Sequence, residues 1–150
     1  MNLSQQFKSG LDRLENTLLT PIVPGELEGW MAGLSESAEL VGTLLWRQIE
    51  TVHNPEYDEI VRRDPDLFPQ VKQLRQGDKE SLARLEALLD RFAKLKQNAP
   101  RFEPDEAATK ARLDSLIEDG MAWVVHSKRQ ERAFETWSAQ SFNRDVGVGD

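Results

Sequence analysis

Apolar residues recur at steps of three and four along most of the chain, a pattern typical of helices that bury one face. The spacing predicts helices over about 4–19, 26–53, 67–97 and 104–142. Prolines separate these segments, because proline interrupts a helix beyond its first turn. Pro55 and Pro65 bracket one or two further helical turns around residues 57–62.

Four amphipathic helices bury their apolar stripes by packing against one another, and short connections favour antiparallel neighbours. The sequence therefore predicts an all-α fold: an up-down-up-down antiparallel four-helix bundle with a short helical excursion between the second and third helices. A length of 150 residues fits one domain. Residues 143–150 contain two glycines and little that can pack, so we expect a flexible or extended tail there.

The composition narrows the chemistry that the bundle can carry. The chain has no cysteine, which excludes disulfides, thiolate ligands and cysteine nucleophiles. Its 19 basic residues are scattered among 26 acidic ones, for a net charge of -7, which disfavours nucleic acid and anionic membranes as partners. The start, MNLSQQFKSG, lacks the apolar core of a secretory signal. No stretch approaches the roughly 18 apolar residues of a transmembrane helix, so we expect a cytoplasmic protein.

The third predicted helix carries one polar residue inside its apolar stripe. Asp78 stands between Leu74 and Leu82, where the helical period expects an apolar side chain, and Gly77 precedes it. A buried carboxylate needs a hydrogen-bond partner or a metal. Three interpretations follow: Asp78 lies at the edge of the stripe and reaches solvent, it joins a buried network with His126 or an arginine, or it binds a metal.

Further polar residues lie near the stripes of the other helices. Gln48 stands close to the second stripe. A gap in the fourth stripe, near the middle of the bundle, is filled by His126, Ser127, Gln130 and Glu131. Ser127 and His126 are not a catalytic dyad, because neighbours on a helix point about 100° apart. We assign His53 to the C-terminus of the second helix, where an imidazole interacts with free carbonyls.

Three stretches in the second, third and fourth helices read LWRQIETVHNPEYDEIVRRDP, LRQGDKESL and HSKRQERAFETWSAQSFNRDVGVGD. The order of these stretches resembles that of the hemerythrin-like (HHE cation-binding) family. The resemblance covers the chain from about Trp30 onward. The resemblance implies a four-helix bundle whose core holds a pair of iron ions. In that family, histidines and carboxylates from successive helices bind the metal.

The residues at the implied ligand positions depart from the family pattern. The second-helix and third-helix positions fall on Leu45, Ile49, Gly77 and Asp78. The fourth-helix histidine and carboxylate are matched by His126 and Glu131, but the first helix has no histidine. An oxygen-carrying site of this family uses more histidines than the two in this chain.

We therefore expect a non-catalytic hemerythrin-like bundle that has lost its di-iron site and holds no cofactor. Leu45 and Ile49 fit this hypothesis, because apolar side chains fill the void that a metal leaves. The protein would act by binding a protein partner, a second copy or a ligand. The alternative is a metal-binding protein for iron, oxygen or redox sensing, in which Asp78, His126 and Glu131 hold iron or another divalent metal.

The tryptophans bear on the binding hypothesis. They occur at helical spacing and are expected in the core and at interfaces: Trp30, Trp46, Trp123 and Trp137. Trp46 falls beside the second stripe, so we expect it to face a dimer partner or the excursion. A plain all-α adaptor would dock its partner through exposed aromatic residues such as Trp46, Trp137 and Phe142.

Overall fold

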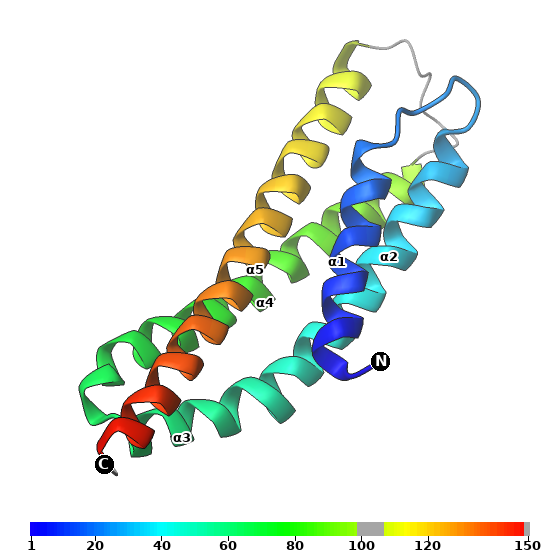
Figure 1. Cartoon of the computed structure of the whole chain (residues 1–150). Coiled ribbons are helices and arrows are strands. Elements are labelled where there is room, and N and C mark those ends of the chain that lie inside the picture. Colours follow the sequence, from blue (N-terminus) through cyan, green and yellow to red (C-terminus); the bar gives the residue numbers. More distant parts are fainter. Residues whose placement is uncertain (99–106, 149–150) are drawn as a thin grey trace.

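The structure, a computed structural model, describes residues 1–98 and 107–148 (Figure 1). This part of the chain is helical and contains no strand. Its elements are α1 (Leu3–Leu19), α2 (Leu27–Gln48), the π-helical turn η1 (Ile49–His53), α3 (Asn54–Arg63), the 3-10 turn η2 (Pro65–Leu67), α4 (Phe68–Asn98) and α5 (Ala107–Val148). The all-α prediction is confirmed, and α1 and α4 begin and end within one residue of their expected bounds. The expected start near residue 104 lies outside the described residues.

The sequence predicted that the second helix ends at His53, but the helix continues past this residue. α2, η1 and α3 follow one another without a break, so the expected excursion is the continuation of the second helix. In η1 the amide of Asn54 donates to the carbonyl of Ile49, five residues back, which widens the turn. A proline clashes with the carbonyl four residues before it in a regular helix. The wider turn directly before Pro55 relieves that constraint.

The helix α5 continues to Val148, into the segment expected to be a flexible or extended tail. Arg144 gives a physical reason, because its guanidinium lies 3.3 Å from Asp64 and 3.1 Å from Asp66. These contacts connect the last turns of α5 to the end of α3 and to η2.

The helices pack so that each long one has two long neighbours. α1 contacts α2 and α5, α2 contacts α4, and α4 contacts α5, while α3 packs on α5 and α4. Figure 1 shows α1 beside α2, with α3 extending beyond the N-terminal end of α1. α1 and α2 therefore pack on one half of α4 and α5, and α3 packs on their other half.

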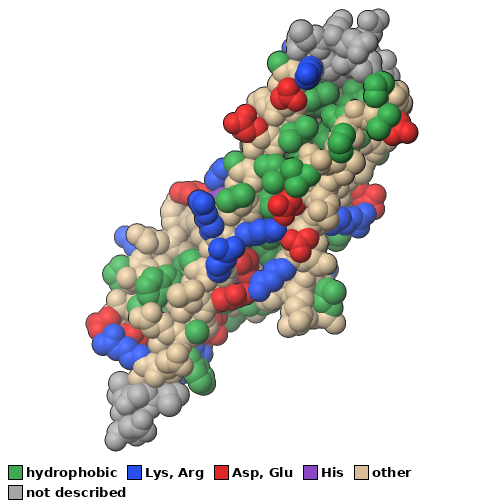
Figure 2. Space-filling view, turned by 45° about the horizontal axis from the view of Figure 1, so that its top comes forward, with side chains coloured by type: hydrophobic (Ala, Val, Ile, Leu, Met, Phe, Trp, Pro, Cys, Tyr) green, Lys and Arg blue, Asp and Glu red, His purple; other side chains and the backbone are tan. Residues whose placement is uncertain are grey.

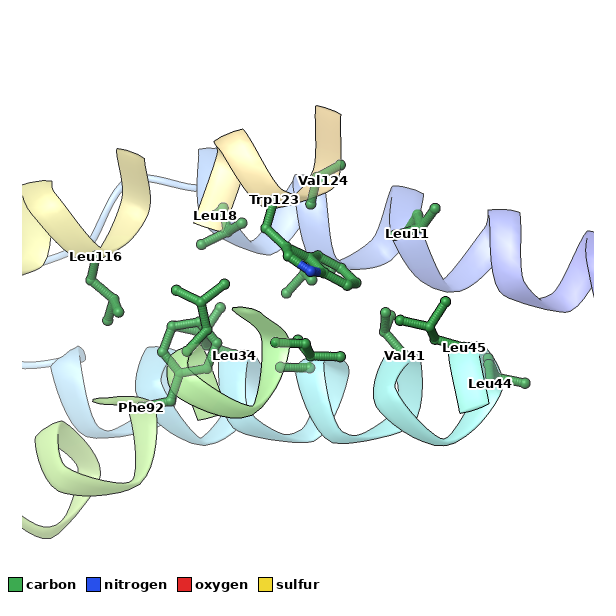
Figure 3. Packing of buried hydrophobic residues seen from close by; sticks show 14 of the residues in the cluster. Leu11, Leu18, Leu34, Val41, Leu44, Leu45, Phe92, Leu116, Trp123 and Val124 are labelled. Atoms are coloured by element: carbon green, nitrogen blue, oxygen red, sulfur yellow. The ribbon is translucent and has the colours of Figure 1, made fainter. Parts of the chain in front are cut away.

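The apolar interior falls into two clusters. The larger lies among α1, α2, α4 and α5 and includes Trp123, whose indole donates to the carbonyl of Ser81 at 2.9 Å. Figure 3 shows Trp123 reaching from α5 into the space between the helices. The smaller cluster joins α3, η2, α4 and α5 around Tyr57, Leu74 and Phe134.

Surface charges connect α1 to α5. Lys128 contacts Asp12 and Glu15 at 2.9 and 2.6 Å, and Lys8 pairs with Glu135. Figure 2 shows basic and acidic side chains next to one another across the middle of this face. Such exposed pairs contribute little, about 0–1 kcal/mol each. Within the described ranges, no helix is both long and apolar enough to cross a bilayer.

Candidate functional site

His53 is the centre of a buried polar cluster. It is the last residue of η1 and is 0% exposed. Its Nδ1 lies 3.1 and 3.0 Å from the two carboxylate oxygens of Asp78, on α4. Its Nε2 lies 2.6 Å from Oε1 of Glu131, on α5, as a close ion pair without the alignment of a regular hydrogen bond. Both nitrogens face carboxylates, which favours the doubly protonated imidazolium.

Asp78 receives two further hydrogen bonds. The hydroxyl of Tyr57, on α3, donates to Oδ2 at 2.8 Å, and the side-chain amide of Gln130, on α5, donates to Oδ1 at 3.2 Å. The side chain of Asp78 is only 4% exposed. Burying a carboxylate this deeply is costly unless hydrogen-bond donors replace the lost water, and several donors do so here.

Glu131 accepts a hydrogen bond on the other side of the cluster. The amide of Gln48, at the end of α2, donates to Oε2 of Glu131 at 3.2 Å. The same nitrogen donates to the hydroxyl of Ser4, on α1, at 2.8 Å. The cluster therefore joins side chains from every long helix, and on α4 and α5 its members lie between the two apolar clusters.

Gly77 makes room for the amide that binds Asp78. The amide nitrogen of Gln130 also donates to the carbonyl of Leu74 at 2.5 Å, so the side chain lies flat against α4. A Cβ at residue 77 would stand 2.7 Å from Cδ of Gln130, which is closer than atoms approach without displacement. The glycine directly before Asp78 is thus explained by the close approach of α5.

Two aromatic rings pack against the imidazole of His53. The ring centroid of Phe134 lies 4.3 Å from that of His53, and the ring of Tyr57 lies 5.7 Å away. The guanidinium carbon of Arg75 stands 5.0 Å from the centroid of Tyr57. An imidazolium against aromatic faces gains a cation–π attraction that a neutral ring lacks.

The electrostatic environment keeps a proton in the interior. Burial by itself lowers the pKa of His53, but the contacts with Asp78 and Glu131 outweigh burial and raise the pKa to about 9. Burial, with the negative charge of Asp78, raises the pKa of the Tyr57 hydroxyl far above its ordinary value. At neutral pH the imidazole of His53 is therefore protonated, and the phenol of Tyr57 keeps its proton.

The predicted site residues are brought together in part. Asp78 is buried, so the interpretation that it reaches solvent is wrong, and its histidine partner is His53 rather than His126. His126 is half-buried on α5, and its Nε2 has no hydrogen-bond partner among the described residues. Residues 126 and 131 lie five apart and so point in different directions on a helix. Ser127 is buried, and within the described ranges its hydroxyl also has no partner.

Sequence reasoning missed His53 because it was assigned to a helix end. A signal was present in the sequence. The apolar stripe of the second helix includes Leu45 and Ile49. At further steps of four it reaches His53 and Tyr57. Reading the period through Pro55 places both side chains on the inward face, opposite Asp78.

The donor arrangement does not fit a di-iron centre. Asp78 and Glu131 contact different nitrogens of the imidazole, so the ring stands between the carboxylates instead of sharing a common metal position with them. Within residues 1–98 and 107–148, no group of three or more histidine, aspartate or glutamate side chains is arranged to hold a metal ion. The arrangement binds a proton and compensates buried charge.

Comparisons with known proteins give no match. No protein-family model, no curated protein and no solved structure is similar enough to this chain to be matched.

Proposed function

We propose that the protein is a non-catalytic helical bundle of hemerythrin-like ancestry that has lost its di-iron site and acts by binding a partner. The observation that carries this proposal is the occupation of the interior. Leu45 and Ile49, at two positions where the resemblance implies metal ligands, are buried apolar side chains of the larger cluster. His53 fills the space between the remaining carboxylates.

The helix order supports the proposed ancestry. The contacts of α1 with α2 and α5, and of α4 with the same two helices, support an up-down-up-down bundle. In such bundles, metal sites lie in the core on facing helices. The buried polar cluster occupies a comparable place, which is consistent with a metal centre replaced by an ion-paired histidine.

The state of His53 supports a role without catalysis. A general base needs a free nitrogen near the group that it deprotonates. Both nitrogens of His53 face carboxylates, and the side chain is completely buried. No nucleophilic hydroxyl is positioned on this ring by any described residue.

A metal-binding role is the second candidate. It is favoured by one observation, the contact of a histidine with two carboxylates of residue types that bind divalent metals. Binding would have to displace the imidazolium proton, because a metal ligand must be neutral imidazole.

Elemental analysis of protein purified without chelator or affinity-tag metal tests the proposal. We expect no stoichiometric metal and a thermal melt unchanged by added Fe(II) or Mn(II). Metal at about one ion per chain that is lost in Asp78→Ala would overturn the proposal in favour of the second candidate. Two irons per chain would restore the ancestral site and overturn it as well.

A further inference from the structure

An exposed groove runs between α2 and α4. It has a volume of about 470 Å³ and is lined by Glu39, Gly42, Thr43, Trp46, Leu82, Leu85, Glu86 and Leu89. Gly42 opens the groove, because a Cβ at this residue would already touch Leu85 at 3.4 Å. Its floor is therefore formed by Gly42 and by the apolar side chains of the leucines.

Trp46 forms one end of the groove. It is 58% exposed, although tryptophan is a large side chain that is highly buried on average. An exposed tryptophan beside an apolar groove is the residue type most enriched at binding hot spots. The expectation that Trp46 faces a partner is consistent with this position.

The charges of the groove have one sign. Its two charged lining residues are Glu39 and Glu86, one on each side. Both are exposed, and neither forms an ion pair with any residue that the structure describes. Two carboxylates without an ion pair, one on each side of an apolar floor, favour a cation with an apolar face.

We propose that this groove binds a cationic amphipathic helix of another protein. This inference rests on the proposed function, since it names the partner class of the binding bundle. Residues 39 and 46 lie seven positions apart on α2, a length of about 10 Å, or two helical turns. Apolar side chains at steps of three and four would contact Gly42 and the leucines, while lysines on both flanks meet Glu39 and Glu86.

A second copy of the chain is a poorer occupant. A two-fold contact places the same patch on both sides of the interface. Glu39 and Glu86 would then face the same carboxylates of the other copy, and like charges at an interface are unfavourable. The net charge of -7 adds to this repulsion at long range.

The test uses the full chain and a fluorescein-labelled Leu/Lys peptide of about four helical turns, with leucines on one face and lysines on the other. Binding is measured by fluorescence anisotropy at low and high salt. The comparison peptides are one with the same composition in scrambled order and one with glutamate in place of lysine. We expect binding of the amphipathic peptide alone, weakening as salt rises.

Two variants locate the binding. Trp46→Ala is expected to weaken affinity about tenfold at both salt concentrations, because it removes apolar contact area. The double variant Glu39→Gln with Glu86→Gln is expected to weaken it about fivefold to tenfold at low salt only. The matched control, Glu28→Gln with Glu118→Gln, changes exposed carboxylates away from the groove and should stay within about twofold.

Each result supports or overturns the inference. Equal binding of the scrambled peptide, or equal weakening by the control pair, shows attraction to net charge and overturns it. Self-association in sedimentation that Trp46→Ala abolishes makes the occupant a second copy and overturns it too. Metal content measured on the same preparation separates the two proposals: a metal-free protein without peptide binding defeats the groove assignment alone, and stoichiometric metal defeats the proposed function.

Discussion

The imidazole of His53 and the carboxylate of Asp78 lie 3.0 Å apart in the interior, although 25 residues separate them in the sequence. The pairing explains why an aspartate stands in an otherwise apolar stripe. A carboxylate there is tolerable because an opposite charge, a phenol and an amide replace its water. It also makes the π-helical turn structurally important, since η1 places His53 at this depth.

Removing His53 should destabilise the protein much more than removing His126. His53→Ala leaves Asp78 and Glu131 buried without their cation, and losing one partner of a buried ion pair typically lowers the free energy of unfolding by about 3–5 kcal/mol. His126→Ala removes a half-buried ring whose Nε2 has no partner in the described part of the chain. Its expected effect is about 1 kcal/mol or less. Urea unfolding followed by circular dichroism measures both, and equal losses would contradict the assigned pairing.

The stability of the protein should fall as the pH rises above neutrality. The pKa of His53 is raised from 6.5 to about 9 in the folded state, so folding favours the protonated ring. The resulting stabilisation is fully present below pH 6.5 and is lost as the pH rises through about 9. Asp78, Glu131 and Tyr57 face the ring, and the raised pKa of Tyr57 keeps the phenol protonated throughout this range.

The size of this effect follows from the shift, about 3 kcal/mol at most. Urea midpoints measured between about pH 6 and pH 9.5 should fall in the wild type and change far less in His53→Gln. An equal slope in both proteins would assign the pH dependence to other groups. A direct check is the NMR titration of the His53 ring, which should stay protonated at neutral pH.

Tyr57→Phe should have a smaller effect than His53→Ala. The substitution removes one donor to Asp78 and keeps the ring that packs on His53 and Phe134. Losing a buried hydrogen bond to a charged group costs about 1.5–3 kcal/mol. In an Asp78→Asn background the loss should shrink, because a neutral acceptor gains less from the phenol. A loss that is the same in both backgrounds would show that the hydroxyl acts elsewhere.

The helices could be predicted from the sequence because their apolar periodicity is a local property. Leu3 to Leu19 and the long stripe through Val71 and Phe92 need no knowledge of the partner helices. The exception is the region around Pro55, where proline predicted a break. A π-helical turn accommodates the proline instead. The contacts that His53 makes from the end of this turn are tertiary, and local periodicity does not predict them.

The site was predicted less well, because a partner across helices depends on register and direction. Asp78 was recognised as anomalous from its own stripe alone. The choice between His126 and His53 required the relative height of three helices, which periodicity does not give. Gln130 and Gly77 were each visible as unusual, but their contact arises only from the close approach of α4 and α5.

Gly77→Ala should destabilise the protein, although alanine favours a helix over glycine by about 0.5–1 kcal/mol. The new Cβ would stand 2.7 Å from Cδ of Gln130 and would displace the amide from Asp78 and from the carbonyl of Leu74. We expect a net loss of about 1–2 kcal/mol. The matched control is Gly33→Ala on α2, where no atom lies within 4 Å of the added Cβ, so this variant should be neutral or more stable.

Thermal unfolding of both variants, and of Gly77→Ala combined with Gln130→Ala, separates the effects. The double variant should lose less than the sum of its parts, because the clash vanishes with the amide. Stabilisation by Gly77→Ala equal to that of Gly33→Ala would mean that Gln130 does not lie against α4, and the donor set of Asp78 would have to be revised.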